Sequence, residues 1–181
     1  MKDNKGITMV TLVITIVILL IIAGISVGTG NKVIKSSELE NVKTNMLLIK
    51  AKGKEYVENA NFKLGTNFES ATDKESRLSN AKAELKGEEI SDSAIFEGNI
   101  NITQENITTD NTNYVYYYKL SSEILKEMGI SNVESNENKG WYVIKYDIKN
   151  VEVQVYNTIG FENEENKYYS LNDLQNLEVD F

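Results

Sequence analysis

The sequence predicts an α+β fold in which a long N-terminal helix packs on a C-terminal antiparallel sheet. Three observations support this prediction: an uncharged run from Ile7 to Gly28, apolar residues at helical spacing from Leu39 to Ala60, and alternating segments in the last third of the chain. With 181 residues, of which 41% are hydrophobic, the chain is long enough for one globular domain and a membrane segment.

The uncharged run follows six mostly polar residues that end in Gly6. Its 22 residues as a helix span roughly 33 Å, enough to cross the hydrocarbon core of a bilayer. Twelve of the sixteen residues from Ile7 to Ile22 are β-branched, which lipid or tight helix packing accommodates. Three interpretations of the uncharged run remain open. It is a signal peptide that is removed after Gly28, an anchor that is not cleaved, or a segment that stays attached because the chain is cut just before it, at Gly6.

The helix is expected to continue beyond this run. Apolar and small residues recur at steps of three and four, and charged residues lie elsewhere on the helical wheel. This stripe consists of Leu39, Val42, Met46, Ile49, Gly53, Tyr56 and Ala60. The spacing also fits three heptads of a coiled coil, but the small residues favour packing on the chain's own sheet.

The region from Asn61 to Asn113 is polar and weakly patterned. Thr72 with Glu75 forms the pattern of a capping box, and Gly87 stands where a helix would stop, so we predict a short helix over 73–86. Its apolar face consists of Leu78, Ala81 and Leu85.

The last third is predicted to form the sheet. Residues 114–120, 140–147 and 150–157 have strand patterns, and residues 121–129 are typical of a short capped helix that ends at Gly129. The last two strands form a hairpin across Ile148 and Lys149. Three tyrosines of the first strand, at positions 114, 116 and 118, alternate with Val115, Tyr117 and Lys119 and are expected to fill both sides of it.

Composition excludes several functional classes. The chain has no His and no Cys, which removes imidazole bases, thiol nucleophiles and the usual zinc ligands. No phosphate-binding glycine loop and no distinct carboxylate pair is found, so we expect no enzyme and no cofactor. The formal charge of −8 disfavours nucleic acid as a partner.

Two acidic loops have the oxygen ligands that calcium prefers. One contains Asn132, Glu134, Asn136, Glu137 and Asn138, and the other contains Glu162, Glu164 and Glu165. Neither has the Asp-rich spacing and closing bidentate Glu of a calcium loop. We therefore expect solvated hairpin loops and no metal site.

The stretch KGITMVTLVITIVILLIIAGISV, residues 5–27, resembles the leader and N-terminal helix of type IV pilins and type II secretion pseudopilins. The family has a short basic leader, a glycine at the cut, and an apolar run that enters a long amphipathic helix. The resemblance implies a pilin-like fold, cleavage by prepilin peptidase between Gly6 and Ile7, and N-methylation of Ile7.

Some positions differ from the family pattern. Thr11 stands where the family usually has Glu, and Ile7 stands where it usually has Phe. These differences resemble pilin-like proteins of Gram-positive genomes and are compatible with a minor pilin. The C-terminal segment GFENEENKYYSLNDLQNL, residues 160–177, also resembles segments of those proteins.

Four hydroxyl residues of the apolar run fall within about 60° of one another on a helical wheel. They are Thr8, Thr11, Thr15 and Ser26. Two interpretations remain open, a contact between helices in the filament and hydroxyls bonded to their own carbonyls one turn back.

By the resemblance we expect a leader (1–6), a transmembrane and filament-core helix (7–30) and an extracytoplasmic head (31–181). The head divides into an amphipathic helix (31–61), a variable polar region (62–113) and a sheet region (114–181). The expected protein is a pilin or pseudopilin, either a major or a minor subunit, that spans the membrane once with a cytoplasmic N-terminus and then joins a cell-surface filament.

The implied partners are other copies or other pilins, prepilin peptidase, the assembly machinery and the membrane. A membrane-anchored binding module that never polymerises is the alternative from another class, and a secreted enzyme or adhesin released by signal peptidase is a third. Of these, only the filament subunit requires a cut at Gly6.

Overall fold

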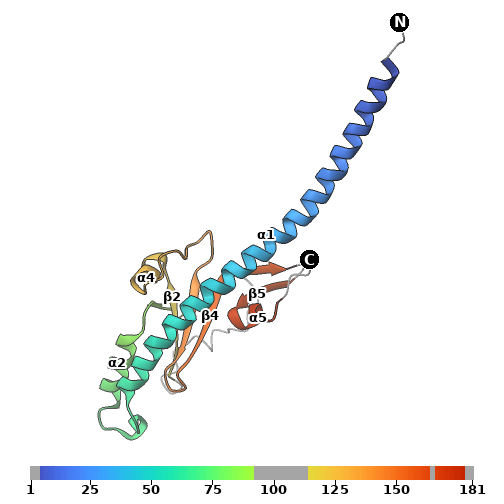
Figure 1. Ribbon diagram of the computed structural model, residues 1–181. Helices are drawn as coiled ribbons and strands as arrows, with labels where there is room; N and C mark the ends of the chain where they lie inside the picture. The colour runs from blue at the N-terminus through green and yellow to red at the C-terminus, as the bar shows by residue number, and fades with distance from the viewer. Residues whose placement is uncertain (1–4, 92–113, 164–165, 178–181) are drawn as a thin grey trace. The chain divides into compact units, whose positions relative to one another are not determined.

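A computed structural model describes residues 5–91, 114–163 and 166–177 of the chain, with side chains from residue 34 onward. The described residues have an α+β fold, with one long helix and an antiparallel sheet, as the sequence predicts (Figure 1). The chain divides into two compact units, residues 1–40 with 178–181, and residues 41–177.

Helix α1 (Lys5–Leu64) is 60 residues long, so the apolar run and the amphipathic stretch are parts of one helix. It ends three residues after the predicted boundary at 61, because Leu64 is fully buried and extends the apolar face by one more turn. Gly65 then takes a positive φ of 71°, a conformation that suits glycine at the end of a helix.

The sheet has five strands in the order β1-β2-β3-β4-β5, and every neighbouring pair is antiparallel. Their bounds are β1 (Glu88–Glu89), β2 (Val115–Leu120), β3 (Tyr142–Asp147), β4 (Glu152–Asn163) and β5 (Asn166–Ser170). The two-residue strand β1 lies in the region expected to be variable and polar, so the sheet begins earlier in the chain than predicted.

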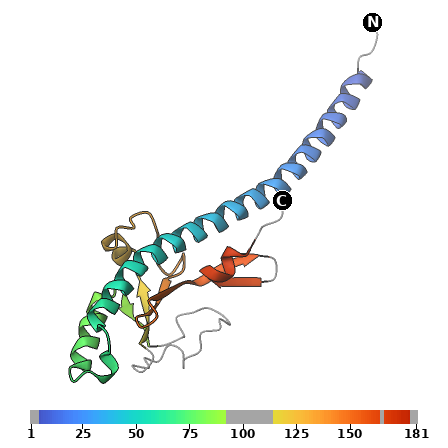
Figure 2. The ribbon, with the colours of Figure 1, turned by 60° about the horizontal axis from the view of Figure 1, so that its bottom comes forward.

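In residues 41–177, α1 lies across one face of the sheet (Figures 1 and 2). Gly53 is the point of closest approach, because a Cβ there would meet the side chains of Ile144 on β3 and Val153 on β4. The stripe residues of this unit are buried or half-buried: Val42, Met46, Ile49, Gly53, Tyr56 and Ala60. Packing on the chain's own sheet is therefore the interpretation that the structure confirms.

The tyrosines of β2 fill both sides of the strand, as predicted. Tyr116 and Tyr118 are buried on one side, where the Tyr118 ring meets that of Tyr146 on β3 at 5.6 Å between centroids. Tyr117 is buried on the other side together with Val143. Both sides of the strand are buried from Tyr116 to Tyr118, which explains its unusual aromatic content.

Strand β4 extends to Asn163 and does not end at 157 as predicted. Its register shifts between Tyr156 and Phe161, so the first half pairs with β3 and the second half with β5. The Asn157 side chain holds this bulge, because its Oδ1 accepts hydrogen bonds from the backbone N–H of Ile159 and Gly160 at 3.0 and 2.9 Å. Asn157, the last residue of the predicted strand, thus bends a longer strand in the structure.

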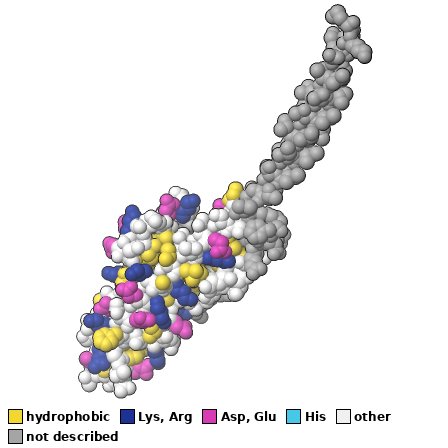
Figure 3. All heavy atoms as spheres, viewed as in Figure 1, with side chains coloured by type: hydrophobic (Ala, Val, Ile, Leu, Met, Phe, Trp, Pro, Cys, Tyr) yellow, Lys and Arg dark blue, Asp and Glu magenta, His cyan; other side chains and the backbone are white. Residues whose placement is uncertain are grey.

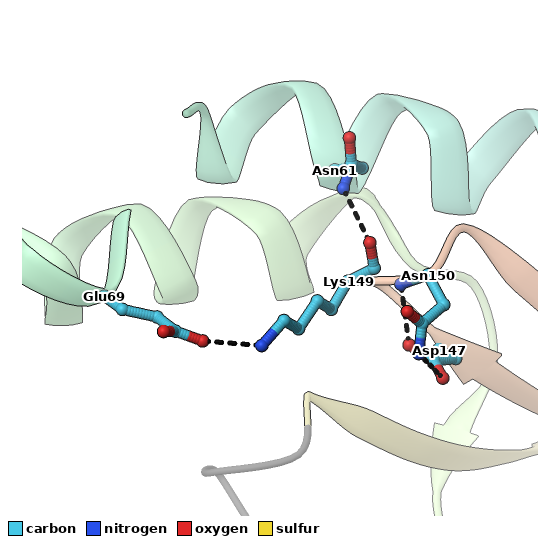
Figure 4. Close-up of polar contacts among 5 residues, drawn as sticks. All are labelled: Asn61, Glu69, Asp147, Lys149 and Asn150. Carbon is cyan, nitrogen blue, oxygen red and sulfur yellow. Dashed lines mark hydrogen bonds and ion pairs between the residues drawn. The ribbon is translucent and has the colours of Figure 1, made fainter. Parts of the chain in front are cut away.

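The connection between β3 and β4 has four residues, Ile148 to Val151, and not the predicted two. Its shape is fixed by Asp147, whose carboxylate accepts hydrogen bonds from the backbone N–H and the side-chain amide of Asn150 at 2.9 and 2.8 Å (Figure 4). Val151 has a φ of 55°, an uncommon conformation for a β-branched residue.

A short 3-10 helix η1 (Phe68–Ser70) and helix α2 (Lys74–Glu84) follow α1. The predicted capping box of Thr72 and Glu75 is wrong. The N-cap is Asp73, which makes no capping bond because its carboxylate pairs with Arg77 Nε at 2.9 Å.

The helix α2 also ends before the predicted stop at Gly87. That glycine has a φ of 131°, and a Cβ on it would lie 2.6 Å from Cβ of Tyr118. Gly87 therefore allows the chain to approach β2 so that β1 can pair with it.

Two short helices complete the fold. Helix α4 (Ser122–Glu127) confirms the prediction for residues 121–129, since the Ser121 side chain caps it and Gly129 follows in a positive-φ conformation. Helix α5 (Leu171–Gln175) was not expected; the Ser170 side chain caps it, and Leu171 and Leu174 are buried. Each of the described short helices η1, α2, α4 and α5 thus has at least one buried side chain that anchors it.

Candidate functional site

The residues that the sequence singles out lie on the N-terminal part of α1. Gly6 and Ile7 are in its first turns, and Thr8, Thr11, Thr15 and Ser26 follow on the same unbroken helix. Their side chains lie outside the described residues. A search for helices long and apolar enough to cross a membrane found none, and it covered only the described side chains, from residue 34 onward.

The described part of α1 has a second feature that the sequence analysis missed. Four large apolar side chains are exposed among the described residues, and all four belong to this helix: Ile34, Leu47, Leu48 and Phe62. Phe62 is the most exposed, at 82%. Scattered single residues of this kind are ordinary, but several on one element indicate a contact surface.

Within residues 41–64, these side chains share one direction. At 100° per residue, Leu48, Ala51 and Phe62 fall within about 60° of one another, on the side opposite to the buried stripe. Leu47 lies beside them. We name these four residues, Leu47, Leu48, Ala51 and Phe62, the outer strip of α1.

A hollow extends the outer strip beyond the helix. It has a volume of about 500 Å³ and lies between α1 and the segment that follows α4. Its wall on the helix consists of Asn45, Leu48, Ala51, Lys52 and Glu55, and Ile130 and Val133 are among the residues on the other side. Ile130 and Val133 are themselves buried, so the exposed large apolar side chain at this hollow is that of Leu48.

Charge is distributed unevenly along the sequence of this part of the chain. Residues 41–64 carry five lysines and two glutamates, a formal charge of +3, whereas residues 65–181 carry 10 basic and 22 acidic residues, a formal charge of −12. Basic and acidic side chains both lie among the apolar ones on this face (Figure 3). On the helical wheel Glu55 and Glu58 fall between the members of the outer strip, so the strip is an apolar surface with acidic residues within it and lysines at its sides.

The C-terminal end of α1 is tied to the sheet by polar contacts (Figure 4). The Asn61 amide donates a hydrogen bond to the Ile148 carbonyl at 2.8 Å. Next to it, Lys149 Nζ lies 2.7 Å from Glu69 Oε1. Lys149 lowers the pKa of the Glu69 carboxyl by hydrogen bonding and charge, and Glu69 raises the pKa of Lys149.

A second hollow, of about 380 Å³, has a different character. Most of its walls are polar, with amide and charged side chains from α1, the loop before β3 and β4: Asn41, Asn45, Asn132, Glu134, Lys139 and Asn157. Asn157 is already engaged in the β4 bulge. The other side chains offer hydrogen-bonding groups to the hollow.

The acidic loop at 132–138 is a turn. The side-chain oxygen of Asn136 accepts hydrogen bonds from the backbone N–H of Asn138 and Lys139 at 3.0 and 3.1 Å, and Glu134 and Glu137 are exposed. No group of three metal-ligating side chains occurs in the described residues. Glu164 and Glu165 of the other loop lie outside them.

The buried phenols are held neutral. Burial raises the pKa of Tyr116 to about 12, with a further contribution from Glu89, and burial also raises the pKa of Tyr118 and Tyr146. A phenol in this state does not exchange protons near neutral pH. The tyrosines therefore act as packing groups of the sheet.

Comparison of the chain with family models, with curated proteins and with solved structures gave no match. Inference about function therefore rests on the helix, the head and the surfaces described above. The outer strip could have been found in the sequence, because Leu47, Leu48 and Phe62 are apolar at wheel positions where a head helix packed on one side needs polar residues.

Proposed function

We propose that this chain is a structural subunit of a type IV pilus-like or type II secretion-like filament. Prepilin peptidase cuts it between Gly6 and Ile7, and the apolar part of α1 holds the subunit in the membrane before assembly and in the filament afterwards. The head has no catalytic role in this proposal. It faces outward on the cell surface.

One observation carries the proposal. A single helix runs from Lys5 to Leu64; its sequence is uncharged from Ile7 to Gly28, and its last part is packed on a sheet. A helix end of that composition is not stable in water and needs lipid or other apolar helices around it. The resemblance of residues 5–27 to pilin leaders adds the site of cleavage.

The mass of the mature chain tests this proposal. The full chain is expressed with an active prepilin peptidase, extracted from membranes and analysed intact. We expect loss of residues 1–6 and the added mass of one N-methyl group on Ile7. A Gly6→Leu variant should stay uncut, and an Asp3→Ala variant should be cut normally.

Two results would contradict the proposal. An uncut chain in the presence of active peptidase would remove the basis for pilin-type processing. A mature N-terminus at Thr29 would instead identify a signal peptide and a head that is released from the membrane.

The second candidate is a membrane-anchored binding module that does not polymerise. The polar hollow of about 380 Å³ favours it, because amide and charged side chains from three parts of the head converge there. Sheared surface fractions separate the two candidates, since only a filament subunit appears in high-molecular-weight material.

A further inference from the structure

We propose that the polar hollow of about 380 Å³ binds a neutral, hydroxyl-rich ligand, namely a mono- or disaccharide. The hollow lies within the unit of residues 41–177, between α1, the loop before β3, and β4. This inference goes beyond the filament role and does not depend on it. It gives a ligand class to the hollow that favours the second candidate function.

The walls of the polar hollow are held in place by a buried amide. The Asn157 side chain is 5% exposed. Its Oδ1 accepts hydrogen bonds from the backbone N–H of Ile159 and Gly160, and its Nδ2 donates to the Lys139 carbonyl at 3.2 Å. One side chain therefore joins the β4 bulge to the loop that bears Lys139, and contacts within the chain preform the hollow, which lowers the cost of ordering on binding.

The loop before β3 is fixed at two further points. The Asn136 side chain accepts hydrogen bonds from the backbone N–H of Asn138 and Lys139 at 3.0 and 3.1 Å. Gly140 has a φ of 80°, and a Cβ on it would collide with the Asn157 side chain. This close packing sets the position from which the Lys139 side chain extends beside the hollow.

Polar side chains around this framework are available to a ligand. Four of the lining residues are exposed: Asn41, Asn132, Glu134 and Lys139. In the described part of the chain, neither Glu134 nor Lys139 takes part in an ion pair. The hollow at η1 is different, because its Glu69 and Lys149 are already paired with each other at 2.7 Å.

The kinds of groups in the polar hollow identify the ligand class. An amide both donates and accepts hydrogen bonds, as a hydroxyl does, and the lining includes four asparagines: Asn41, Asn45, Asn132 and Asn157. The formal charges of Glu134 and Lys139 cancel, and the chain's net charge of −8 disfavours an anion. A zwitterion would engage these two charges but offers few partners for the amides, whereas a neutral ligand with several hydroxyls offers partners to all of these groups.

Size sets the upper limit of the ligand. Sites for small molecules typically have volumes of about 300–1,000 Å³, and the volume of about 380 Å³ lies at the lower end of this range. Val42 and Gly160 also line the hollow and provide surface against which the C–H groups of a sugar ring pack. The hollow therefore suits a mono- or disaccharide better than a longer chain.

Saturation-transfer NMR on the full chain tests this inference. The chain is kept in a polyoxyethylene detergent, which contains no sugar group, and is titrated separately with glucose, galactose, N-acetylglucosamine and lactose. We expect saturation transfer to at least one of these sugars, with a Kd in the millimolar range because the ligand is small. Glycine and inorganic phosphate are titrated in the same way as a zwitterion and an anion.

Variants at exposed positions locate the binding. The double variant Asn41→Ala and Asn132→Ala removes two available amides and should weaken sugar binding about tenfold. Asn132→Trp should fill the hollow and abolish binding. The matched control is Asn59→Ala, at an exposed position of α1 that does not line the hollow, and it should change the Kd less than twofold. Circular dichroism verifies the fold of each variant.

Three results would overturn the inference. They are the absence of saturation transfer to any of the four sugars by the folded chain, equal sugar binding by the unchanged chain and the double variant, and tighter binding of glycine or phosphate than of any sugar. None of these results affects cleavage at Gly6, and an uncut chain leaves sugar binding measurable. The inference and the proposed function therefore fail separately.

Discussion

The two sides of α1 in residues 41–64 differ in what their apolar residues contact. On the inner side, Gly53 approaches β3 and β4 so closely that a Cβ there would force the Ile144 side chain to shift, and Met46, Ile49 and Ala60 are fully buried. On the outer side, Leu48 and Phe62 remain largely exposed. One side of this helix thus packs against the chain's own sheet, whereas large apolar side chains on the other side remain exposed.

This difference separates residues that stabilise the head from residues that do not. Substitutions on the inner side remove or overfill contacts inside the head and must change its free energy of unfolding. Substitutions on the outer side change surface that the folded head does not use. Four predictions test how complete this separation is.

The largest effect is expected from alkaline pH, which acts on the tyrosines of the sheet. Burial raises the pKa of Tyr116 to about 12 and raises that of Tyr146. Below the ordinary tyrosine pKa of 10.0 the phenols are neutral in both the folded and the unfolded chain. Their contribution to the free energy of unfolding is therefore fully present there. Above it the unfolded chain releases protons that the folded chain keeps, and the free energy of unfolding falls until the pH passes the folded pKa.

We therefore expect the head to unfold cooperatively between about pH 10 and pH 12. Tyrosinate absorbance and loss of circular dichroism should appear together, and Tyr146→Phe should make the pH dependence shallower by one proton. Ionisation of all tyrosines near pH 10 with unchanged circular dichroism would show that the phenols are not buried.

The second effect is expected at Gly53. Gly53→Leu forces a side chain between α1 and the sheet, and should lower the free energy of unfolding by about 3 kcal/mol. The matched control is Ala51→Leu on the outer strip, which should change it by less than about 0.5 kcal/mol. Denaturation of the full chain in mild detergent, followed by the single tryptophan Trp141, measures both; equal effects would contradict the two-sided description of α1.

A smaller effect is expected at Asn61. Its amide donates to the Ile148 carbonyl at 2.8 Å, and Asn61→Ala should cost about 1 kcal/mol because that carbonyl loses its partner. Asn59, two residues earlier, is exposed, and Asn59→Ala should be neutral in the same denaturation measurement. A neutral Asn61→Ala would mean that water replaces the amide at the hairpin.

The smallest effect on stability is expected at Phe62. The side chain is 82% exposed, so Phe62→Ser should change the free energy of unfolding by less than about 0.5 kcal/mol. A loss of stability above about 1 kcal/mol would place Phe62 in the core and remove it from the outer strip.

Local patterns in the sequence determined much of this fold. The period of the stripe from Leu39 to Ala60 predicted a buried helix face, and alternation predicted β2, β3 and the first half of β4. Ser121 and Gly129 bounded α4 correctly, because capping depends on residues within one turn. The uncharged run from Ile7 to Gly28 is likewise a property of the sequence alone.

Only the tertiary structure decided the remaining features. Glu88 and Glu89 pair with β2 because Gly87 permits a close approach to Tyr118, and no local pattern encodes that partner. Asn157 bends β4 in place of ending it, since its side chain replaces the missing ladder bonds at the bulge. Periodicity in the sequence predicts which residues share one face of a helix, but it does not predict what packs against that face. Whether an apolar residue such as Phe62 is buried therefore depends on which elements lie beside it in the folded chain.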